Sequence, residues 1–523
     1  MGDTDPAAPV RMAELLAALS LGIDLGFGQP MEHVLRQCRI ALVICELAGL
    51  EEADRAAVYY TALLINVGCH SDAHEQAHWF GDDIAMKATK YQYEPFSAAD
   101  IAAMLRMLGS GGTPLHRVRV AFDFAWSGRK EVDGMIAGHA RMARALGEQL
   151  GLPAAVLDSL AGSYERWDGK GFPGDLAGID IPVASRIAQL AEFLEAAHRT
   201  GGIDAAVEVA ERRSGKQFDP TLVELFTADV EKVFHGIDEL GSWDAVLDSE
   251  PALTVRLSPD ECDAALAAIA RFVDLKSPYM LGHSQALAVL ASRAGEQLGL
   301  PADDVRALYR AGLVTGFGRL GVSNGIWDKP APLSAGEWER VRLHPHLTER
   351  MLHQSEALAP LGRVAAQHRE RLDGSGYPHG LTGPAITRPG RILGAADAYQ
   401  AMREPRPHRD ALTADDAATQ LQAEVRAGRM DGAAVDAVLQ VAGHRLGRRR
   451  EGPAGLTARE VEVLRLLARG LSNKQIAQLL VIAPKTAGNH IEHVYTKIAA
   501  SNRAEASLFA MQHGLLPEED SAP

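Results

Sequence analysis

The sequence predicts an all-α protein built from two related helical domains and a small helical module at the C-terminal end. Apolar residues recur at helical spacing along nearly the whole chain, without the alternating pattern or the hairpin signals of strands. One glycine-rich loop motif occurs twice, which indicates an internal repeat. With 523 residues the chain is also too long for a single hydrophobic core.

The composition is that of a globular protein with an acidic body. Hydrophobic residues make up 47% and charged residues 23% of the chain, and the formal net charge is −15. From Arg449 onward, nine Lys and Arg stand against eight Asp and Glu, so nearly all of the negative charge lies upstream. Because an acidic body repels phosphate, we expect contact with DNA only through the tail.

The chain shows no sign of secretion or membrane insertion. The first residues are polar, and no apolar run approaches the roughly 18 residues of a membrane span. Four cysteines are too few for a disulfide framework in a chain of this length. We therefore expect a cytoplasmic protein without membrane contact.

Three helices are predicted at the N-terminal end. The first begins near Arg11 and is broken by Gly26, and the next two cover about 30–49 and 51–67. In the first helix, one face collects the apolar residues Met12, Leu15, Leu16 and Leu19.

The repeated loop fixes the register of two copies. Asp-Gly-Lys-Gly-Phe-Pro begins at Asp168, and Asp-Gly-Ser-Gly-Tyr-Pro begins at Asp373, 205 positions later. Upstream, His33 and His283 are 250 positions apart, so the first copy contains an insert of 45 residues. The predicted domains are 1–248, with its insert at about 70–138, and 249–446, followed by a linker at 447–455 and a module at 456–516.

The module shows the start signals of three successive helices. Thr457 and Glu460 form a capping box, as do Ser472 and Gln475, and Pro484 opens the third helix. The third helix has an apolar face opposite a polar stripe, and a short helix, a tight turn and a striped helix match helix-turn-helix geometry. The stripe consists of Lys485, Asn489, Glu492 and Thr496.

This module resembles the LuxR-type helix-turn-helix family. The matching blocks are LTAREVEVL from Leu456, GLSNKQIAQLL from Gly470, PKT from Pro484, NHI from Asn489 and RAEA from Arg503. The resemblance implies four helices that bind double-stranded DNA. We expect a homodimer, because one such module buries too little surface for tight specific binding. The expected DNA contacts are Lys485, Thr486, Asn489, Glu492, His493, Lys497 and Arg503.

The second copy resembles the HD-GYP family of cyclic dinucleotide phosphodiesterases. The matching blocks are HS at His283, AGLVTGFGRLGV from Ala311, HP at His344, HRERLDGSGYP from His368 and GRILGAADAYQAM from Gly390. Histidine and carboxylate ligands hold divalent metals that activate water for phosphodiester hydrolysis. The remnant metal ligands would be His283, His344, His368 and Asp397.

Several positions depart from the HD-GYP pattern. Thr315 and Gly316 stand where the family has its His-Asp doublet, and Arg369 replaces the second His of a His pair. A metal that loses these ligands no longer activates water by the family mechanism. We therefore expect no catalysis and no cofactor, with one residual divalent metal as the alternative.

The first copy departs further from the HD-GYP pattern. Ile65 and Asn66 occupy its doublet positions and Glu192 its final Asp position, so we expect no family-type metal centre. Its insert contains a run of histidines, for which the spacing favours a polar, solvated helix face over a metal site. The run is Cys69, His70, Asp72, His74, Glu75 and His78.

The Gly-rich loop survives in both copies. Its glycines and proline favour a role in backbone shape, and a remnant nucleotide pocket with Arg369 or Arg371 at a phosphate is the alternative. In the second copy the loop residues are Asp373, Gly374, Gly376, Tyr377 and Pro378.

The leading hypothesis is a DNA-binding transcriptional regulator. Its two degenerate HD-GYP-like domains would be a pseudoenzyme body that senses a small molecule or nucleotide, or arranges the dimer. The alternative is a metal-dependent cyclic dinucleotide phosphodiesterase with a DNA-binding domain. In a third interpretation the body is only an oligomerisation scaffold.

Overall fold

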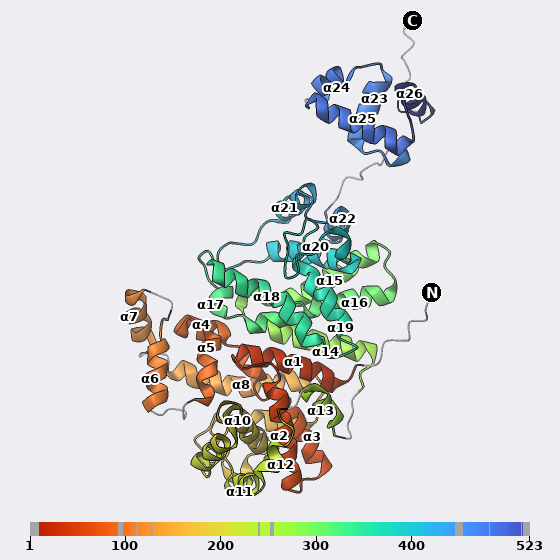
Figure 1. Ribbon diagram of the computed structural model, residues 1–523. Helices are drawn as coiled ribbons and strands as arrows, with labels where there is room; N and C mark the ends of the chain where they lie inside the picture. Colours follow the sequence, from red (N-terminus) through yellow and green to blue (C-terminus); the bar gives the residue numbers. More distant parts are fainter. Residues whose placement is uncertain are drawn as a thin grey trace. The chain divides into compact units, whose positions relative to one another are not determined.

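The computed structural model describes residues 10–92, 98–110, 113–124, 126, 129–238, 241–251, 256–444, 453–480, 482–513 and 515. Within these ranges the regular elements are helices and no strand occurs, which confirms the predicted all-α class (Figure 1). No helix among these residues is long and apolar enough to span a bilayer.

The first copy consists of long helices around one core and an insert of shorter ones. The long-helix part contains α1 (Met12–Gly26), α2 (His33–Leu47), α3 (Glu52–Leu64), α8 (Arg129–Gln149), α9 (Ala154–Ala161), α10 (Val183–Arg213), α11 (Pro220–Ala228), α12 (Val230–Phe234) and α13 (Ser242–Asp248). The insert contains the 3₁₀ helix η1 (Val67–His70), α4 (Ala73–Phe80), α5 (Asp83–Ala88), η2 (Thr89–Tyr91), α6 (Ala98–Met107) and α7 (Pro114–Asp123).

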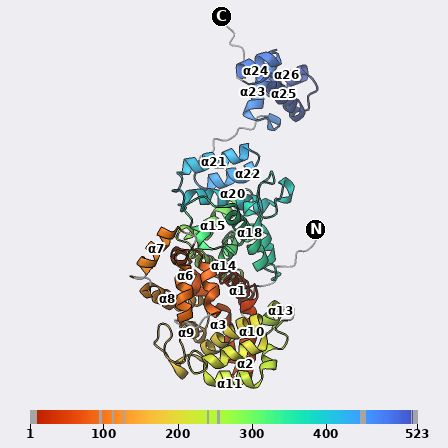
Figure 2. The same cartoon turned by 60° about the vertical axis from the view of Figure 1, so that its left-hand side comes forward.

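The second copy repeats this plan without the insert. Its helices are α14 (Pro259–Asp274), α15 (His283–Gln297), α16 (Ala302–Val314), η6 (Phe317–Gly321), α17 (Asn324–Trp327), α18 (Ala335–Leu352), α19 (Ala359–Ala365), η7 (Ala366–Arg369), α20 (Arg388–Arg403), α21 (Ala414–Arg426) and α22 (Gly432–Val441). In two views the copies lie at opposite ends of one body, with α1 and α14 between them (Figures 1 and 2).

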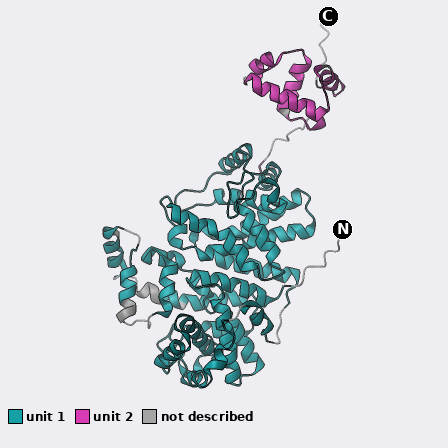
Figure 3. Cartoon of the chain, in the orientation of Figure 1, with its two compact units in different colours: residues 1–443 teal, residues 444–523 magenta. Residues whose placement is uncertain are grey.

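The chain forms two compact units, Met1–Gly443 and His444–Pro523 (Figure 3). Both copies therefore belong to one unit, and the boundary between them at 248–249 stays a prediction. Most of the proposed linker, residues 447–452, lies outside the described residues.

The smaller unit has the predicted module with four helices around an apolar core. The helices are α23 (Ala458–Ala468), α24 (Asn473–Leu480), α25 (Pro484–Ile498) and α26 (Arg503–Gln512). Both predicted capping boxes form, with the Glu460 amide 3.2 Å from Thr457 Oγ1 and the Ser472 amide 2.9 Å from Gln475 Oε1. Ala483 begins α25 without a side-chain cap, and the last predicted module residue, Leu516, lies outside the described residues.

Helix α1 is buried on nearly all sides, whereas the sequence analysis assigned it a single apolar face. Ser20 and Asp24, which lie off that face, are as inaccessible as the leucines. Gly22 packs on the second copy so closely that a Cβ there would lie 2.5 Å from Met351 Cε and 2.8 Å from Leu320 Cδ1. The helix therefore joins the cores of both copies.

A buried carboxylate also joins the insert to the second copy. Asp83 Oδ1 accepts hydrogen bonds from Ser323 Oγ at 2.9 Å and from the Asn324 amide at 2.8 Å. Asp83 Oδ2 lies 3.2 Å from the ammonium groups of both Lys87 and Lys276. Burial alone would raise the pKa of Asp83, but the two ammonium groups and these hydrogen bonds hold it well below its usual range.

We predict that Asp83→Ala strongly destabilises the larger unit. The change leaves two buried ammonium groups without a counter-charge, so the free energy of unfolding should fall by about 3–5 kcal/mol in urea titrations. Asp82→Ala is the control, because it removes the side-chain cap of α5 and a loose, largely exposed ion pair with Arg340, and should cost about 1 kcal/mol. Equal losses for the two variants would contradict this account.

Candidate functional site

The second copy brings its four predicted metal ligands into one buried cluster. His283 begins α15, His344 lies in α18, His368 in η7 and Asp397 in α20. Helix α20 contacts both α15 and η7, and α18 also contacts η7, so residues far apart in the sequence meet here. All four side chains are at most 1% exposed.

Two histidines of the cluster point unprotonated nitrogens at each other. Nδ1 of His344 lies 2.6 Å from the Val341 carbonyl oxygen, and Nδ1 of His368 lies 2.7 Å from that of Ala365. A carbonyl oxygen only accepts, so each Nδ1 holds its proton and each Nε2 presents a lone pair. The two Nε2 atoms are 3.2 Å apart, a distance at which the lone pairs repel unless a cation or proton lies between them.

Burial keeps this pair of histidines neutral. It lowers the pKa of His344 well below the usual range and that of His368 to about 3, and the nearby guanidinium groups add to the effect. Neutral imidazoles in a fixed tautomer are the form that binds a metal ion.

Asp397 supplies a buried carboxylate with spare acceptor capacity. Its Oδ1 lies 3.4 Å from Nε2 of His283, and its Oδ2 lies 3.1 Å from Nη2 of Arg369. Among the described residues, Oδ2 nevertheless accepts no hydrogen bond of good geometry. Burial alone would raise the pKa of Asp397, but Arg369 and the histidines hold it well below its usual range, so the group is charged.

Two guanidinium groups lie beside this buried cluster. Nη2 of Arg319 lies 3.5 Å from His283 Nε2, and burial lowers the pKa of Arg319 to about 10. Nε of both Arg319 and Arg369 is buried without a hydrogen-bond partner in the described part of the chain. Such groups are suited to bind phosphate oxygens.

The two positions at which the HD-GYP pattern has its His-Asp doublet offer no metal ligand in the structure. Thr315 Oγ1 donates to the Gly312 carbonyl at 2.9 Å, and Gly316 offers no side chain, so neither position provides an imidazole or a carboxylate. The remaining set still fits a divalent metal in its chemistry, because it combines neutral imidazoles with a charged carboxylate that has an unused oxygen.

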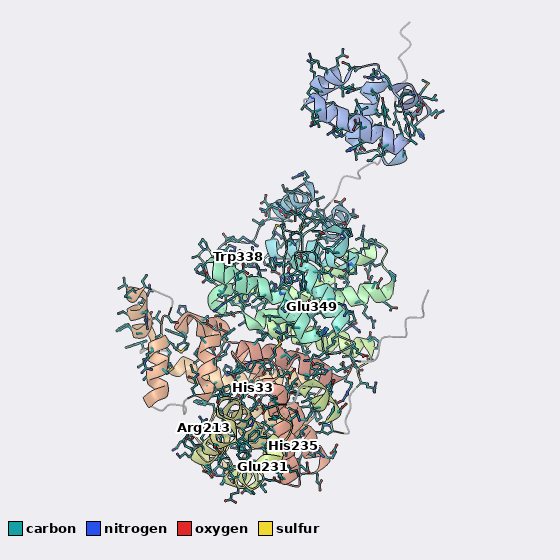
Figure 4. The ribbon with its side chains drawn as sticks, in the orientation of Figure 1. His33, Arg213, Glu231, His235, Trp338 and Glu349 are labelled. Carbon is teal, nitrogen blue, oxygen red and sulfur yellow. The ribbon has the colours of Figure 1, made fainter. Side chains whose placement is uncertain are left out.

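The four ligand atoms are spaced more widely than in a closed metal site. Among the described residues, one trio of potential ligands has atoms within 4.8 Å of one another, and it is half exposed or exposed. It consists of His346, Glu349 and His379, with Glu349 labelled on α18 in Figure 4.

The Gly-rich loop of the second copy lies beside the histidine pair. The Tyr377 ring is 6.2 Å from that of His344, centroid to centroid. Gly376 packs so tightly that a Cβ would lie 2.4 Å from the Arg371 amide nitrogen, and Asp373 Oδ1 accepts from the Ser375 amide at 3.0 Å. The glycine therefore serves backbone shape, while the tyrosine ring packs edge-on against His344.

In the first copy, a lysine from the insert lies where the second copy has its cluster. Nζ of Lys90 is 2.6 Å from Glu192 Oε1 and 2.9 Å from Asn66 Oδ1. Glu192 stands where the HD-GYP pattern has its final Asp, and Asn66 stands at the second position of its His-Asp doublet. The sequence analysis missed Lys90, because the insert has no counterpart in the second copy.

The histidines of the insert do not form a solvated face as predicted. His70 is 1% exposed and packs edge-on against Phe27. His74 pairs with Asp328 of the second copy, at 2.7 Å, while His78 is exposed. The spacing of four residues gave no signal of this burial, because it comes from packing against distant helices.

Helix α25 exposes most of the predicted DNA contacts. Lys485, Thr486, Asn489, Glu492 and His493 are exposed on one stripe.

The other two predicted DNA contacts are used inside the unit. Nζ of Lys497 bonds Glu460 Oε2 at 2.7 Å, and Nη2 of Arg503 donates to the Leu471 carbonyl at 2.7 Å. The predicted contacts that are exposed on α25 and not engaged in this way therefore lie between Lys485 and His493.

We predict an acid sensitivity that depends on His368. An unfolded histidine takes up its proton near pH 6.5, whereas folded His368 stays neutral down to a pKa of about 3. Stability present above pH 6.5 is therefore lost as the pH falls below it. His368→Asn keeps a donor for the Ala365 carbonyl and should reduce the loss of unfolding free energy between pH 7 and 5 by about 2 kcal/mol in metal-free protein.

The exposed His353 provides the control for this titration. His353→Asn should leave the acid sensitivity unchanged, since that ring stays in water in both states. If His368→Asn were as acid-sensitive as the wild type, His368 would not be buried in its neutral form.

Each of the two units matches a known protein family. The model of the HD domain matches residues 123–222 and 267–434, and that of the luxR family of bacterial regulatory proteins matches 454–510. A 3'3'-cGAMP-specific phosphodiesterase 3 of Vibrio cholerae is 32% identical over 410 residues, which cover 78% of this chain and 89% of that protein. A cyclic di-GMP phosphodiesterase response regulator of Xanthomonas campestris is 31% identical over 177 residues, or 34% of this chain and 47% of that one.

A solved structure agrees with these matches. The crystal structure of a cyclic GMP-AMP specific phosphodiesterase from V. cholerae superposes with a TM-score of 0.59 and 26% identity, and it covers 84% of this chain and 99% of that one.

These findings correct our expectation that the chain is not an enzyme. The relatives are named as phosphodiesterases, one of them along 89% of its length. The expectation counted missing ligands, whereas the structure retains two neutral imidazoles and a charged carboxylate in one buried cluster. The chain belongs to the HD domain family, with phosphodiesterases among its relatives, and ends in a domain of the luxR family of bacterial regulatory proteins.

Proposed function

We propose that the chain is a metal-dependent cyclic dinucleotide phosphodiesterase whose C-terminal unit binds DNA to regulate transcription. The buried His344–His368 pair beside Asp397 carries the enzymatic part of this proposal. The similarity to the 3'3'-cGAMP-specific phosphodiesterase supports it, because that match spans most of both chains. A cyclic dinucleotide with two 3'–5' phosphodiester links is accordingly the proposed substrate.

His344, His368 and Asp397 would hold the metal. Both imidazoles would use Nε2, the nitrogen left free by the carbonyl contacts of Nδ1, and the carboxylate would use Oδ2. A bound divalent ion supplies Lewis acidity toward phosphate and makes water a stronger nucleophile at neutral pH.

Arg319 and Arg369 would bind the substrate phosphate. Each has an unpartnered buried Nε within the described residues, and negative charge that develops on phosphate oxygens is stabilised by such preorganised donors. His283 would be held in place by Glu404, whose Oε2 lies 2.8 Å from its Nδ1, so that its Nε2 faces Asp397 and Arg319.

The DNA-binding part rests on α25. Lys485 and Thr486, at its N-terminal end, would contact phosphate, where the helix dipole also favours an anion. Asn489, in the middle of the exposed stripe, would read a base edge and suits adenine. Two copies of the chain would bind a two-fold related site, because one helix per site gives modest specificity.

The enzymatic proposal predicts a loss of hydrolysis on removal of one ligand. His344→Asn retains a side-chain donor for the Val341 carbonyl but lacks Nε2, so we expect turnover of 3'3'-cGAMP with Mn²⁺ to fall by about 100-fold. Chromatography of the linear dinucleotide product measures this, and His353→Asn is the control. Unchanged turnover in His344→Asn would contradict the assignment of His344 as a metal ligand.

The DNA-binding proposal predicts two different defects in α25. Asn489→Ala should relax preference at one base pair by roughly 1–3 kcal/mol, whereas Lys485→Ala should weaken all sequences alike and reduce the salt dependence. Fluorescence anisotropy with matched and mismatched duplexes separates the two. Lys497→Ala is the matched control, since that ammonium is engaged by Glu460 and should affect the salt slope less.

A further inference from the structure

The first copy contains a cavity of about 280 Å³ between its long helices and the insert. Aromatic, methionine and isoleucine side chains form much of its wall, and basic, neutral polar and one acidic side chain complete it. The apolar lining includes Phe27, Ile65, Phe80, Met104, Met107, Met135, Ile136, Phe172 and Phe193, and the basic lining includes Lys90, Arg166 and Lys170. The cavity therefore suits a small, mainly apolar molecule with one polar end.

Cys69 and His139 of its wall are hydrogen-bonded in series with Asp72. Sγ of Cys69 lies 3.2 Å from Nδ1 of His139, and Nε2 of His139 lies 2.8 Å from Oδ2 of Asp72. The Tyr164 hydroxyl lies 2.8 Å from the same sulfur. A base oriented by a carboxylate and bonded to a thiol is the geometry that activates a cysteine nucleophile.

The charges around the sulfur support this geometry. Burial alone would raise the pKa of Cys69, but the His139 imidazolium and Lys90 outweigh burial and hold it below its usual range. Burial likewise opposes the charge on His139, yet Cys69 and Asp72 raise the pKa of His139 to about 10. The surroundings of the pair therefore favour a thiolate beside an imidazolium over a neutral thiol beside a neutral imidazole.

The other cysteines provide an internal comparison. Cys38, Cys45 and Cys262 are also free and buried. Burial raises the pKa of all three, that of Cys45 to about 12. None of them lines the cavity, so four chemically identical groups differ only in their surroundings.

The backbone around Cys69 indicates which electrophile fits. Acyl transfer needs N–H donors for an oxyanion, but the amides of Cys69 and Ser71 already donate to the Asn66 and Gly68 carbonyl oxygens, at 3.2 and 3.1 Å. Conjugate addition needs instead a soft nucleophile and a proton donor at its side. We propose that Cys69 is a covalent attachment site for small apolar α,β-unsaturated carbonyl compounds.

The addition is balanced with the groups present. Sγ forms a bond to the β-carbon of the compound while the C=C π pair moves toward the carbonyl to give an enolate. Nδ1 of His139 then delivers its proton to the α-carbon and becomes neutral. Nothing leaves, and the net reaction adds S–H across the double bond, so no oxidant or reductant is needed.

Treatment of the full chain with trans-2-octenal tests the proposal. Intact-mass analysis should show one adduct per chain, mapped to Cys69 by peptide analysis and absent in Cys69→Ser. The short-chain reagent trans-2-butenal, which carries the same electrophile but little apolar surface for the wall, should react at least about tenfold more slowly at Cys69. Octenal adducts formed equally at Cys38, Cys45 or Cys262, or equal rates for the two reagents, would overturn the proposal.

The pH dependence of the rate at Cys69 distinguishes a thiol activated by His139 from a thiol that is only accessible. In wild-type protein the rate at Cys69 should stay nearly constant from pH 6 to 8, because the thiolate is already formed. In His139→Gln the rate at pH 6 should fall at least about tenfold and rise with pH like that of an ordinary thiol. Asp72→Asn, which keeps a polar partner for His139, should fall between the two. A wild-type rate that rises tenfold per pH unit would overturn the proposal even if His139→Gln does not fold.

Discussion

A buried carboxylate in each copy must be neutralised by a cation, and much of the body is organised around that constraint. In the second copy Asp397 forms an ion pair with Arg369, and in the first copy Glu192 forms one with Lys90. A carboxylate without a counter-charge at such depth is strongly destabilising. The two copies share the fold and the carboxylate position but differ in the source of the positive charge.

That difference separates the roles of the two copies. In the first copy Lys90 bonds Glu192 directly, and aromatic rings of Phe27, Tyr91, Tyr164 and Phe193 surround its ammonium at 5.5–5.9 Å. In the second copy Arg369 approaches Asp397 at 3.1 Å without a hydrogen bond of good geometry to Oδ2, and two imidazole lone pairs lie nearby. In the first cluster the carboxylate bonds its cation directly, whereas in the second a carboxylate oxygen stays unused beside two imidazole lone pairs.

The sequence predicted the fold where local signals decide the structure. Helical periodicity, two capping boxes and Pro484 located the helices of the smaller unit, because each signal acts within a few residues. The repeated loop located two copies of one domain. Position-by-position comparison also identified the absent doublet at Thr315 and Gly316.

The rest depends on contacts that sequence spacing does not encode. Lys90 is 102 positions from Glu192 and comes from an insert without a counterpart, so no repeat could reveal it. Counting absent ligands led to the wrong expectation about catalysis, because it ignored the tautomer and charge of the groups that remain. Lys497 looked free on its helix, but its partner Glu460 lies 37 positions away.

The most direct test of the account is a single titration of the full chain with Mn²⁺ in the presence of 3'3'-cGAMP, in which bound metal and linear dinucleotide are measured together. The account predicts that both rise in parallel and saturate at the same metal concentration. The account would be contradicted if no linear dinucleotide formed at any Mn²⁺ concentration in protein that still binds DNA.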